Sequence, residues 1–222
     1  MLNWTPARAP GRRALAGSTV RLEPLDPRRH AGPLFQASKD ADSLWDYLGY
    51  GPFDSLATFT KWFEGCAASQ DPLFFAVVDT ASGQAKGMVS YLRMEPVHGA
   101  IEIGHIWFAP ALQRTRQATE AIYLLAKEVF DELGYRRLEW KCNSENAPSR
   151  RAADRFGFVY EGIFRQHMVI KGRNRDTAWF AMTDGDWPLR RDAFKSWIAA
   201  SNFDEQGRQR RSLVEIRASL DG

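Results

Sequence analysis

The hydrophobic positions along the chain follow two different periods. Alternation of apolar and polar residues, or a short apolar run bounded by turn residues, predicts a strand. The strands predicted in this way are residues 19–25, 73–78, 85–94, 100–108, 137–142, 158–164, 167–170 and 178–183. The turn residues Ser82-Gly83 and His98-Gly99 join the second, third and fourth of these strands into an antiparallel meander.

Apolar residues at helical spacing predict the helices. These fall at about residues 30–39, 56–68, 117–133, 149–157 and 187–200. Asp26 and Ser55 are expected to cap the first two helices at their N-termini, and Gly134 is expected to end the third. The second helix is expected to bury its apolar residues Leu56, Phe59, Trp62 and Phe63. Residues 44–52 are aromatic but interrupted by Gly and Pro, so they predict a loop with short helical pieces.

The order of these elements indicates the fold class. One strand, two helices, three strands, a helix, a strand, a helix and further strands predict a mixed α/β (α+β) fold, in which helices flank a predominantly antiparallel sheet. The strand–helix–strand step in the second half adds one parallel pair. Residues 1–17, rich in Pro, Ala, Arg and Gly, are expected to form an extended arm, and residues 18–185 the domain. Residues 186–222 are expected to form a C-terminal helix and polar tail, packed on the domain or extending from it.

The composition restricts the class of protein. With 222 residues, of which 44% are hydrophobic and 26% charged, the chain is long enough for one domain with a sizeable core. It contains no run of about 18 apolar residues and no continuous apolar segment near its N-terminus, so neither a membrane span nor a signal peptide is predicted. The two cysteines, Cys66 and Cys142, lack the spacing of a metal site. Without a disulfide framework they favour a reducing, cytoplasmic location.

The positive charge of the chain is spread over many arginines. The formal net charge is +3, with 23 Arg and 7 Lys against 27 acidic residues. The arginines cluster at positions 12–13, 28–29, 136–137, 150–151, 190–191 and 208–211. They predict either a nucleic-acid surface or a solvated surface. Because the clusters are scattered and acidic residues lie between them, the solvated surface is favoured and a nucleic-acid partner is not expected. The four histidines are too dispersed for a metal site.

Two sequence motifs resemble a known family. Residues 102–105 (Glu-Ile-Gly-His), Ala109-Pro110 and residues 113–121 (Gln-Arg-Thr-Arg-Gln-Ala-Thr-Glu-Ala) resemble the acetyl-CoA-binding motif of the GNAT superfamily. Residues 146–151 (Asn-Ala-Pro-Ser-Arg-Arg) and 156–162 (Phe-Gly-Phe-Val-Tyr-Glu-Gly) resemble its RimJ/RimL branch, which acetylates protein N-termini and some small amines. The resemblance covers about residues 18–185. It implies a sheet whose two parallel strands splay apart, acetyl-CoA as the acyl donor, and N-acetyltransferase activity by direct attack of a primary amine.

The resemblance also implies where the cofactor binds. Its pyrophosphate would lie against the N-terminus of the helix that begins near Gln117, where free N–H groups and the helix dipole attract anions. The residues assigned to this loop are Gln113, Arg114, Thr115, Arg116, Gln117, Ala118 and Thr119. Arg114 and Arg116 stand where the family has glycines. They either supply donors for phosphate oxygens or point to solvent beside a degenerate loop.

The pantetheine arm would enter the gap between the splayed strands. By resemblance it contacts the backbone of Ile106, Trp107 and Phe108, as an added strand would, and the side chain of Asn146. Asn146 could instead stabilise its own loop as an Asx-turn residue. Four residues separate Gly104 from the Ala-Pro pair, one more than in the family form, and the extra residue is consistent with a β-bulge. A bulged backbone N–H would polarise the thioester carbonyl.

Three residues are candidates for the proton transfers. Glu102 would act as the base through a water molecule, or would instead be a structurally paired carboxylate. His105 is the rival base, and strict alternation along the strand places it on the face opposite Glu102 unless a bulge intervenes. Ser149 would donate to the departing thiolate, or would simply cap its helix. The position where many members of the family have a tyrosine is Ala153.

The acceptor site is expected beside the aromatic loop. By resemblance, Trp45, Tyr47 and Tyr50, together with His105, bind the acceptor, although aromatic residues at such spacing also form cores. The acceptor is either a protein N-terminus or a small amine. A homodimer is compatible with the family and with the apolar last helix. The alternative function is a non-catalytic acyl-CoA-binding module, because of the two loop arginines and the absent tyrosine.

Overall fold

The computed structural model describes residues 3–221, so residues 1, 2 and 222, at the ends of the predicted arm and tail, lie outside the described residues. Within the described part, eight strands form one sheet. They are β1 (Leu15–Ala16), β2 (Val20–Pro24), β3 (Leu73–Asp79), β4 (Ala85–Glu95), β5 (Ala100–Phe108), β6 (Arg137–Asn143), β7 (Val159–Ile170) and β8 (Arg173–Thr183). The boundaries of β2 to β6 agree with the apolar pattern to within two residues.

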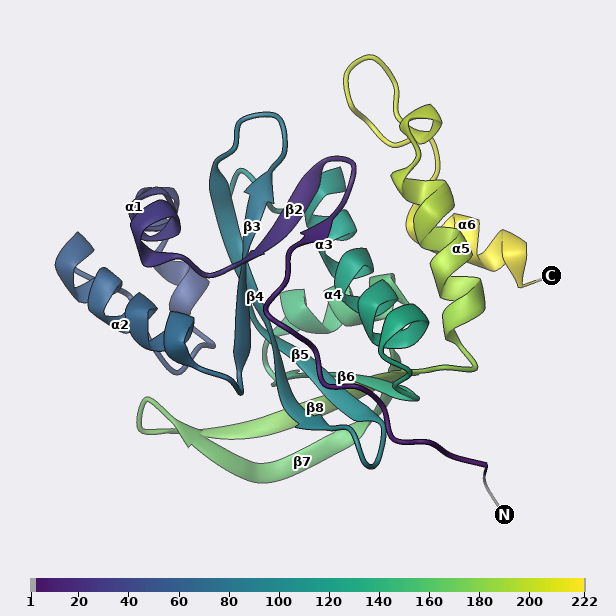
Figure 1. Ribbon diagram of the computed structural model, residues 1–222, viewed down its shortest axis with the longest axis horizontal. Helices are drawn as coiled ribbons and strands as arrows, with labels where there is room; N and C mark the ends of the chain where they lie inside the picture. The colour runs from purple at the N-terminus through teal and green to yellow at the C-terminus, as the bar shows by residue number, and fades with distance from the viewer. Residues whose placement is uncertain (1–2, 222) are drawn as a thin grey trace.

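The sheet is mixed, as predicted. Its spatial order is β1-β2-β3-β4-β5-β6-β8-β7, and all neighbouring pairs are antiparallel except β5 with β6. A parallel pair needs a crossover connection instead of a hairpin, and the segment containing α3 supplies it (Figure 1). The parallel pair therefore lies between two antiparallel halves of the sheet.

Helices cover both faces of the sheet. They are α1 (Pro27–Ser38), α2 (Leu56–Ala68), α3 (Arg116–Lys127), α4 (Ala147–Phe156), α5 (Trp187–Ile198) and α6 (Leu213–Leu220), with the short 3₁₀ segments η1 (Asp42–Trp45) and η3 (Ala200–Asn202) and a π-helical segment η2 (Glu128–Glu132) that continues α3. Helices α1 and α2 lie on one face and α3 to α6 on the other (Figure 1). None of the helices in the described residues is both long and apolar enough to cross a membrane.

Each face has its own hydrophobic core. Successive side chains of a strand point to opposite faces, so Phe75 and Val77 of β3 pack on the α3 side while Phe74 and Ala76 pack on the α1/α2 side. The continuous apolar run of β3 is thus explained by burial on both faces.

Capping residues identified from the sequence start the first two helices. The Asp26 side chain accepts a hydrogen bond of 2.9 Å from the N–H two residues on, and the Ser55 hydroxyl accepts one of 3.2 Å from the N–H three residues on. As predicted, α2 buries Phe59 and Phe63. The prediction for Leu56 was wrong, because this first residue of α2 lies outside the core and is 44% exposed.

The β7–β8 hairpin is longer than predicted. The two predicted strands 158–164 and 167–170 form the single bulged strand β7, and β8 begins at Arg173, five residues earlier than expected. The turn consists of Lys171 and Gly172 alone, with φ of 48° and 72°. Two left-handed residues give a hairpin turn that matches the twist of paired strands, so the pairing continues to the tip.

The two terminal segments are also more structured than their compositions predicted. In the arm, Leu15 and Ala16 pair with β2 as β1. In the tail, α6 begins with a capping box and buries Leu213 and Ile216. An eight-residue helix has little more than two turns, which is too short for a clear periodic signal in the sequence.

A buried carboxylate fixes the start of the sheet. Glu120 of α3 accepts hydrogen bonds from the backbone N–H groups of Ser18 (2.6 Å) and Thr19 (2.7 Å), and from both hydroxyls. Burial by itself would raise the pKa of Glu120, but these hydrogen bonds hold it below its usual value. The carboxylate therefore satisfies the donors of the turn between β1 and β2.

Replacing Glu120 by Gln is expected to lower the free energy of unfolding by about 2–4 kcal/mol, since the amide has one acceptor oxygen and turns an NH₂ group toward buried donors. Urea unfolding measures this change. The control is Glu64→Gln, on the exposed side of α2, which should change the free energy by less than about 0.5 kcal/mol. Equal stability of the two variants would contradict the role of Glu120.

Candidate functional site

The two parallel strands part in the middle of the sheet. β5 and β6 pair from Ala100 and Arg137 to Ile103 and Trp140, where their pairing stops. Beyond that point, within residues 3–221, β5 pairs with β4 alone and β6 with β8 alone. The splayed sheet implied by the resemblance is therefore present. Among the described strands, none pairs with the β6-facing edge of residues 104–108.

A β-bulge lies where the strands part. Two residues of β5, His105 and Ile106, stand opposite the single residue Val89 of β4. His105 has a φ of 49°, in the left-handed region. A bulge bends its strand and increases the local twist, which turns β5 away from β6. The bulge expected from the extra residue after Gly104 is confirmed.

The bulge changes which side chains share a face. Ile103 packs in the core on the α3 side, whereas Trp107, four residues later, packs in the core on the α1/α2 side. His105 packs against Phe74 in the core on the α1/α2 side, with ring centroids 5.1 Å apart. Neighbouring side chains of a strand point to opposite faces, so Glu102, which precedes Ile103, also points to the α1/α2 side. Glu102 and His105 therefore share a face, which is the exception that the sequence prediction allowed for a bulge, because strict alternation ends there.

The N-terminus of α3 presents free backbone donors. Thr115 is the N-cap: its hydroxyl accepts from the N–H of Ala118 at 3.1 Å and donates to the carbonyl of Leu112 at 2.6 Å. Within residues 3–221, the N–H groups of Arg116 and Gln117 find no acceptor. Free first-turn N–H groups at the positive end of a helix dipole suit a pyrophosphate.

The two loop arginines behave differently. Arg114 has a φ of 59°, the left-handed conformation that glycine usually supplies, and its exposed side chain has no partner in the described part of the chain. Arg116 is directed toward the C-terminal segment: its Nε donates to the carbonyl of Ile198 at 2.6 Å, and its guanidinium lies over the ring of Phe203. Arg114 is therefore the loop cation that is free to meet a phosphate.

Other residues assigned to this loop shape it. The Gln113 side chain donates to the carbonyl of Phe108 at 3.0 Å, and the Thr119 hydroxyl accepts from Arg155 at 3.1 Å. Ala118 is buried in the α3 side core. Among the described residues, the donors of this loop without a partner thus include backbone N–H groups and the side chains of Arg114 and Gln117.

Asn146 and Ser149 lie beside the point where the strands part. The Asn146 side chain accepts from the N–H of Ser149 at 3.0 Å, so α4 begins at Ala147 and the predicted start at Ser149 was wrong. The Ser149 hydroxyl accepts a hydrogen bond of 3.0 Å from the indole N–H of Trp140, the last residue of β6 that pairs with β5. Ala153, at the position of the family's tyrosine, is fully buried.

Glu102 is a buried carboxylate with two cationic partners. Its Oε2 accepts from Nη1 of Arg93 at 2.6 Å and lies 3.0 Å from Nζ of Lys141. Its Oε1 finds no hydrogen-bond partner among the described residues. Both arrangements expected for Glu102 are therefore compatible with the geometry: one oxygen is structurally paired and the other is free.

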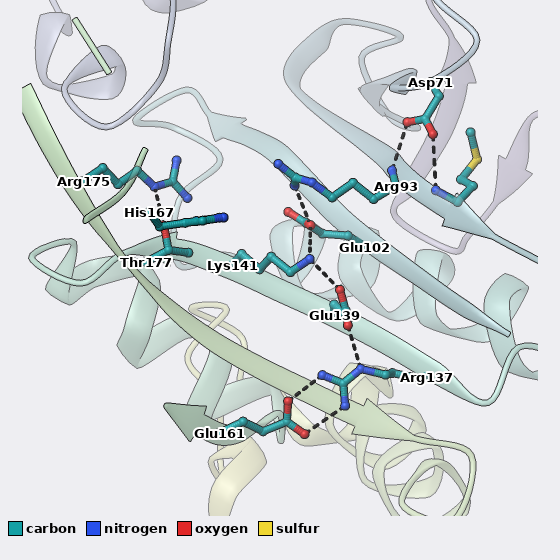
Figure 2. A network of polar contacts seen from close by, with 11 residues as sticks. Asp71, Arg93, Glu102, Arg137, Glu139, Lys141, Glu161, His167, Arg175 and Thr177 are labelled. Atoms are coloured by element: carbon teal, nitrogen blue, oxygen red, sulfur yellow. Dashed lines mark hydrogen bonds and ion pairs between the residues drawn. The ribbon is translucent and has the colours of Figure 1, made fainter. Parts of the chain in front are cut away.

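The ion pairs of Glu102 continue along β6. Lys141 also pairs with Glu139 at 2.6 Å, and Arg137 joins Glu139 to Glu161 of β7 (Figure 2). Nζ of Lys141 lies 3.8 Å from the centre of the Trp179 ring. This ladder spans β4 to β7 on the α1/α2 side of the sheet, and each charge in it has a partner of opposite sign.

His105 is a neutral ring held by Tyr50. The Tyr50 hydroxyl lies 3.1 Å from Nδ1 of His105, and the two rings are stacked with centroids 5.7 Å apart. Burial, together with the charges of Arg93 and Arg175, lowers the pKa of His105 to about 4. The ring is therefore uncharged near neutral pH.

A cavity of about 570 Å³ opens between the aromatic loop and the β7–β8 hairpin. Its lining residues are Asp46, Tyr47, Asn143, Glu145, Ile170, Lys171, Arg173, Asn174 and Arg175. Two contacts join its walls: the Tyr47 hydroxyl donates to the carbonyl of Glu145 at 3.2 Å, and Nζ of Lys171 donates to the carbonyl of Trp45 at 2.8 Å.

The three predicted aromatic residues have three different environments. Tyr47 lines the cavity. Trp45 is 2% exposed and packs against Trp107, with ring centroids 5.2 Å apart, so it belongs to the core. Tyr50 holds His105.

Sequence reasoning missed the cations of the cavity. Lys171, Arg173 and Arg175 lie between the predicted strands 167–170 and 178–183, and none of them was predicted to have a functional role. A usable signal was present, because Arg175 is followed at alternate positions by Thr177 and Trp179, and an arginine on the half-buried face of a strand needs a reason. Within residues 3–221, no group of three His, Cys, Asp or Glu residues is placed to hold a metal ion.

Comparison with known proteins places the chain among acetyltransferases. The Bacillus subtilis (strain 168) protein YdaF is 28% identical over 105 residues, which are 47% of this chain and 57% of that protein. The ribosomal-protein-serine acetyltransferase of Escherichia coli (strain K12) is 31% identical over 95 residues, which are 43% of this chain and 52% of that protein. The chain thus spans little more than half the length of these curated relatives. A crystal structure of a GCN5-related N-acetyltransferase from Brucella melitensis has a TM-score of 0.95 and 50% identity, covering 97% of this chain and 99% of that chain.

The family itself follows from the sequence match and the fold together. Residues 19–159, more than half of the chain, match the family described as Acetyltransferase (GNAT) domain. The E. coli relative agrees with the resemblance to the RimJ/RimL branch. Acetyl-CoA is the acyl donor of this family. With its splayed mixed sheet and this match, the chain belongs to the GNAT family of acetyltransferases.

Proposed function

We propose that this protein transfers the acetyl group of acetyl-CoA to a primary amine. The observation that carries the proposal is the divergence of β5 and β6 after Ile103 and Trp140, next to a helix N-terminus with free N–H groups. The unpaired edge of residues 104–108 can pair with an amide-bearing arm as an added strand would. The gap between β5 and β6 and the N-terminus of α3 together fit a long cofactor with a pyrophosphate at one end.

This chain offers three kinds of contact to acetyl-CoA. The N–H groups of Arg116 and Gln117 would hold the pyrophosphate, and the side chain of Arg114 would add a charged donor. The backbone of residues 106–108 would hold the arm. When bound, acetyl-CoA supplies a thioester whose carbonyl carbon an amine can attack.

Glu102 is the proposed base. An amine attacks only in its neutral form, and its pKa is about 8 for an α-amine or about 10.4 for a lysine-like amine, so a proton must leave it. The free Oε1 of Glu102 would take this proton through a water molecule, while Arg93 and Lys141 fix the carboxylate by its other oxygen. His105 is the competing candidate. Its side chain lies on the same face as Glu102, and its ring is uncharged near neutral pH.

Ser149 is the proposed proton donor to the leaving thiolate. Because the Trp140 N–H donates to Ser149 Oγ, the hydroxyl proton of Ser149 is available to an acceptor, and the thiol of Cys142 competes for it. Its place beside the last paired residues of β5 and β6 supports this role.

Arg114→Gln is expected to weaken acetyl-CoA binding about fivefold to tenfold, because a charge-assisted phosphate contact is lost. Isothermal titration calorimetry measures the change, and S-acetylpantetheine, which lacks the pyrophosphate, should bind both proteins equally. Arg28→Gln, at an exposed position of α1, is the control. An unchanged affinity in Arg114→Gln would assign the phosphates to the backbone donors alone.

Glu102→Gln is expected to retain acetyl-CoA binding and to lower turnover at least about a hundredfold, because a base is typically worth that much. Release of coenzyme A across a panel of amines measures turnover. Glu139→Gln, which removes a carboxylate from the same ion-pair ladder, should retain turnover within a few-fold.

Three other outcomes of this assay are informative. Loss in His105→Gln but not in Glu102→Gln would move the base to His105. Equal loss in Glu102→Gln and Glu139→Gln would make the ladder structural only. Acetyl-CoA binding by the wild type without turnover of any amine would support the non-catalytic acyl-CoA-binding module.

The neutral state of His105 predicts a pH dependence of stability. Its pKa is about 4 in the folded chain against 6.5 ordinarily, so between these values the unfolded chain takes up a proton that the folded chain does not. The contribution is fully present above pH 6.5, and it is lost as the pH falls toward 4, by up to about 3 kcal/mol.

Urea unfolding between pH 4 and 7 measures this loss in the wild type and in His105→Gln. The variant, which can still accept from Tyr50, should lose less stability at low pH. His98→Gln, in an exposed turn, should retain the wild-type slope. Identical slopes in the wild type and His105→Gln would contradict the buried neutral state.

A further inference from the structure

Arg175 is a guanidinium on the cavity wall with no carboxylate to pair with among the described residues. Its Nε donates to the Thr177 hydroxyl at 3.2 Å, and Thr177 is buried and also lies 3.0 Å from Nδ1 of His167. Burial lowers the pKa of Arg175 and outweighs the smaller opposing effects of Cys142 and of Glu102, a carboxylate that is paired with Arg93 and Lys141. Partly buried arginines normally pair with an acid, so this charge lacks its expected counterpart.

A second guanidinium faces Arg175. Figure 2 shows the head groups of Arg93 and Arg175 pointing toward one another, with Glu102 and Lys141 between their strands. The two are close enough that the charge of Arg93 lowers the pKa of Arg175, and both lower the pKa of His105. Only Nη1 of Arg93 is used by Glu102, which leaves the rest of its donor fork available.

The charges around the cavity are unequal. Its lining contributes the cations Lys171, Arg173 and Arg175 against the acids Asp46 and Glu145. Nζ of Lys171 donates to the carbonyl of Trp45, so this cation takes part in a contact within the cavity wall. The lining thus carries one more cation than acids, and a ligand that brings a negative charge to Arg175 would balance this excess.

The volume of the cavity fits a small acceptor. About 570 Å³ lies within the ordinary range for small-molecule sites. The contacts of Tyr47 with Glu145 and of Lys171 with Trp45 tie the aromatic loop to the two walls that a long peptide would have to pass.

We propose that Arg175, with Arg93 opposite, binds a carboxylate of the acceptor, so that the acceptor is a small amino acid whose amine and carboxylate lie close together. The proposal rests on the proposed acetyltransferase function and names the acceptor class of the same site. The planar fork of a guanidinium matches a carboxylate with two parallel hydrogen bonds. When the carboxylate is bound in this way, the amine of the acceptor is oriented toward the face shared by Glu102 and His105, where it can lose its proton.

The test compares acceptors that differ only in the carboxylate. Coenzyme A release is measured with a panel of free amino acids and dipeptides and with their C-terminal amides. The wild type is expected to favour the free amino acids over their amides by at least about tenfold in kcat/KM. Arg175→Gln should reduce this preference to near one by raising KM for the carboxylate-bearing acceptors, while kcat/KM for the amides is unchanged.

Two matched variants separate charge from position. Arg175→Lys, which retains the charge without the fork, should recover part of the preference. Arg165→Gln, which removes an exposed arginine of β7 outside the cavity lining, should retain all of it. Binding of acetyl-CoA, measured by calorimetry, should be equal in all four proteins.

A second measurement does not depend on turnover. Calorimetry in the presence of coenzyme A compares N-acetylated amino acids with their amides as product ligands. The acids should bind the wild type at least about tenfold more tightly, and Arg175→Gln should remove the difference. Equal binding of acid and amide by the wild type, an unchanged preference in Arg175→Gln, or a preference for dipeptides over amino acids would overturn the proposal. Absence of turnover with a retained binding difference would instead count against the acetyltransferase function alone.

Discussion

The geometry of one extra residue in the central strand governs the rest of the site. Because His105 and Ile106 stand opposite a single residue of β4, β5 bends away just where its pairing with β6 ends. The same bulge shifts the alternation of side chains between the two faces by one residue, so that Glu102 and His105 point to the same face. The edge that can receive a cofactor arm and the groups that can move a proton are therefore created by the same local distortion.

Ion pairs stabilise the pairing of β5 with β6 next to the point where these strands part. Lys141 joins Glu102 of β5 to Glu139 of its own strand, one residue beyond the last paired position of β6. Buried ions are tolerated when each has a partner, and loss of one partner leaves the other uncompensated. The ladder thus stabilises the parallel pair next to the point where its pairing ends, and it holds Glu102 by one oxygen while the other has no partner among the described residues.

Several arginines have structural roles that a count of charges does not reveal. Arg12 donates to the carbonyl of Ala67, Arg116 to that of Ile198, and Arg217 to that of Arg155. These contacts tie the N-terminal arm and the C-terminal helices to the domain, because a guanidinium can satisfy carbonyls that helix ends leave without donors. Arg175 differs from them, since its partner is a hydroxyl and its charge faces a cavity.

Sequence alone determined the features that depend on near neighbours in the chain. The helix caps at Asp26 and Ser55, the order of strands and helices, the mixed sheet and the cofactor motif could all be predicted from it, because caps and periodicity involve residues within about four positions of one another. Only the tertiary structure decided that Glu102 and His105 share a face, that Arg116 turns toward Ile198, and that the head groups of Arg175 and Arg93 point toward one another. Each of these depends on the register and curvature of strands that are distant in sequence, and register is fixed by long-range packing.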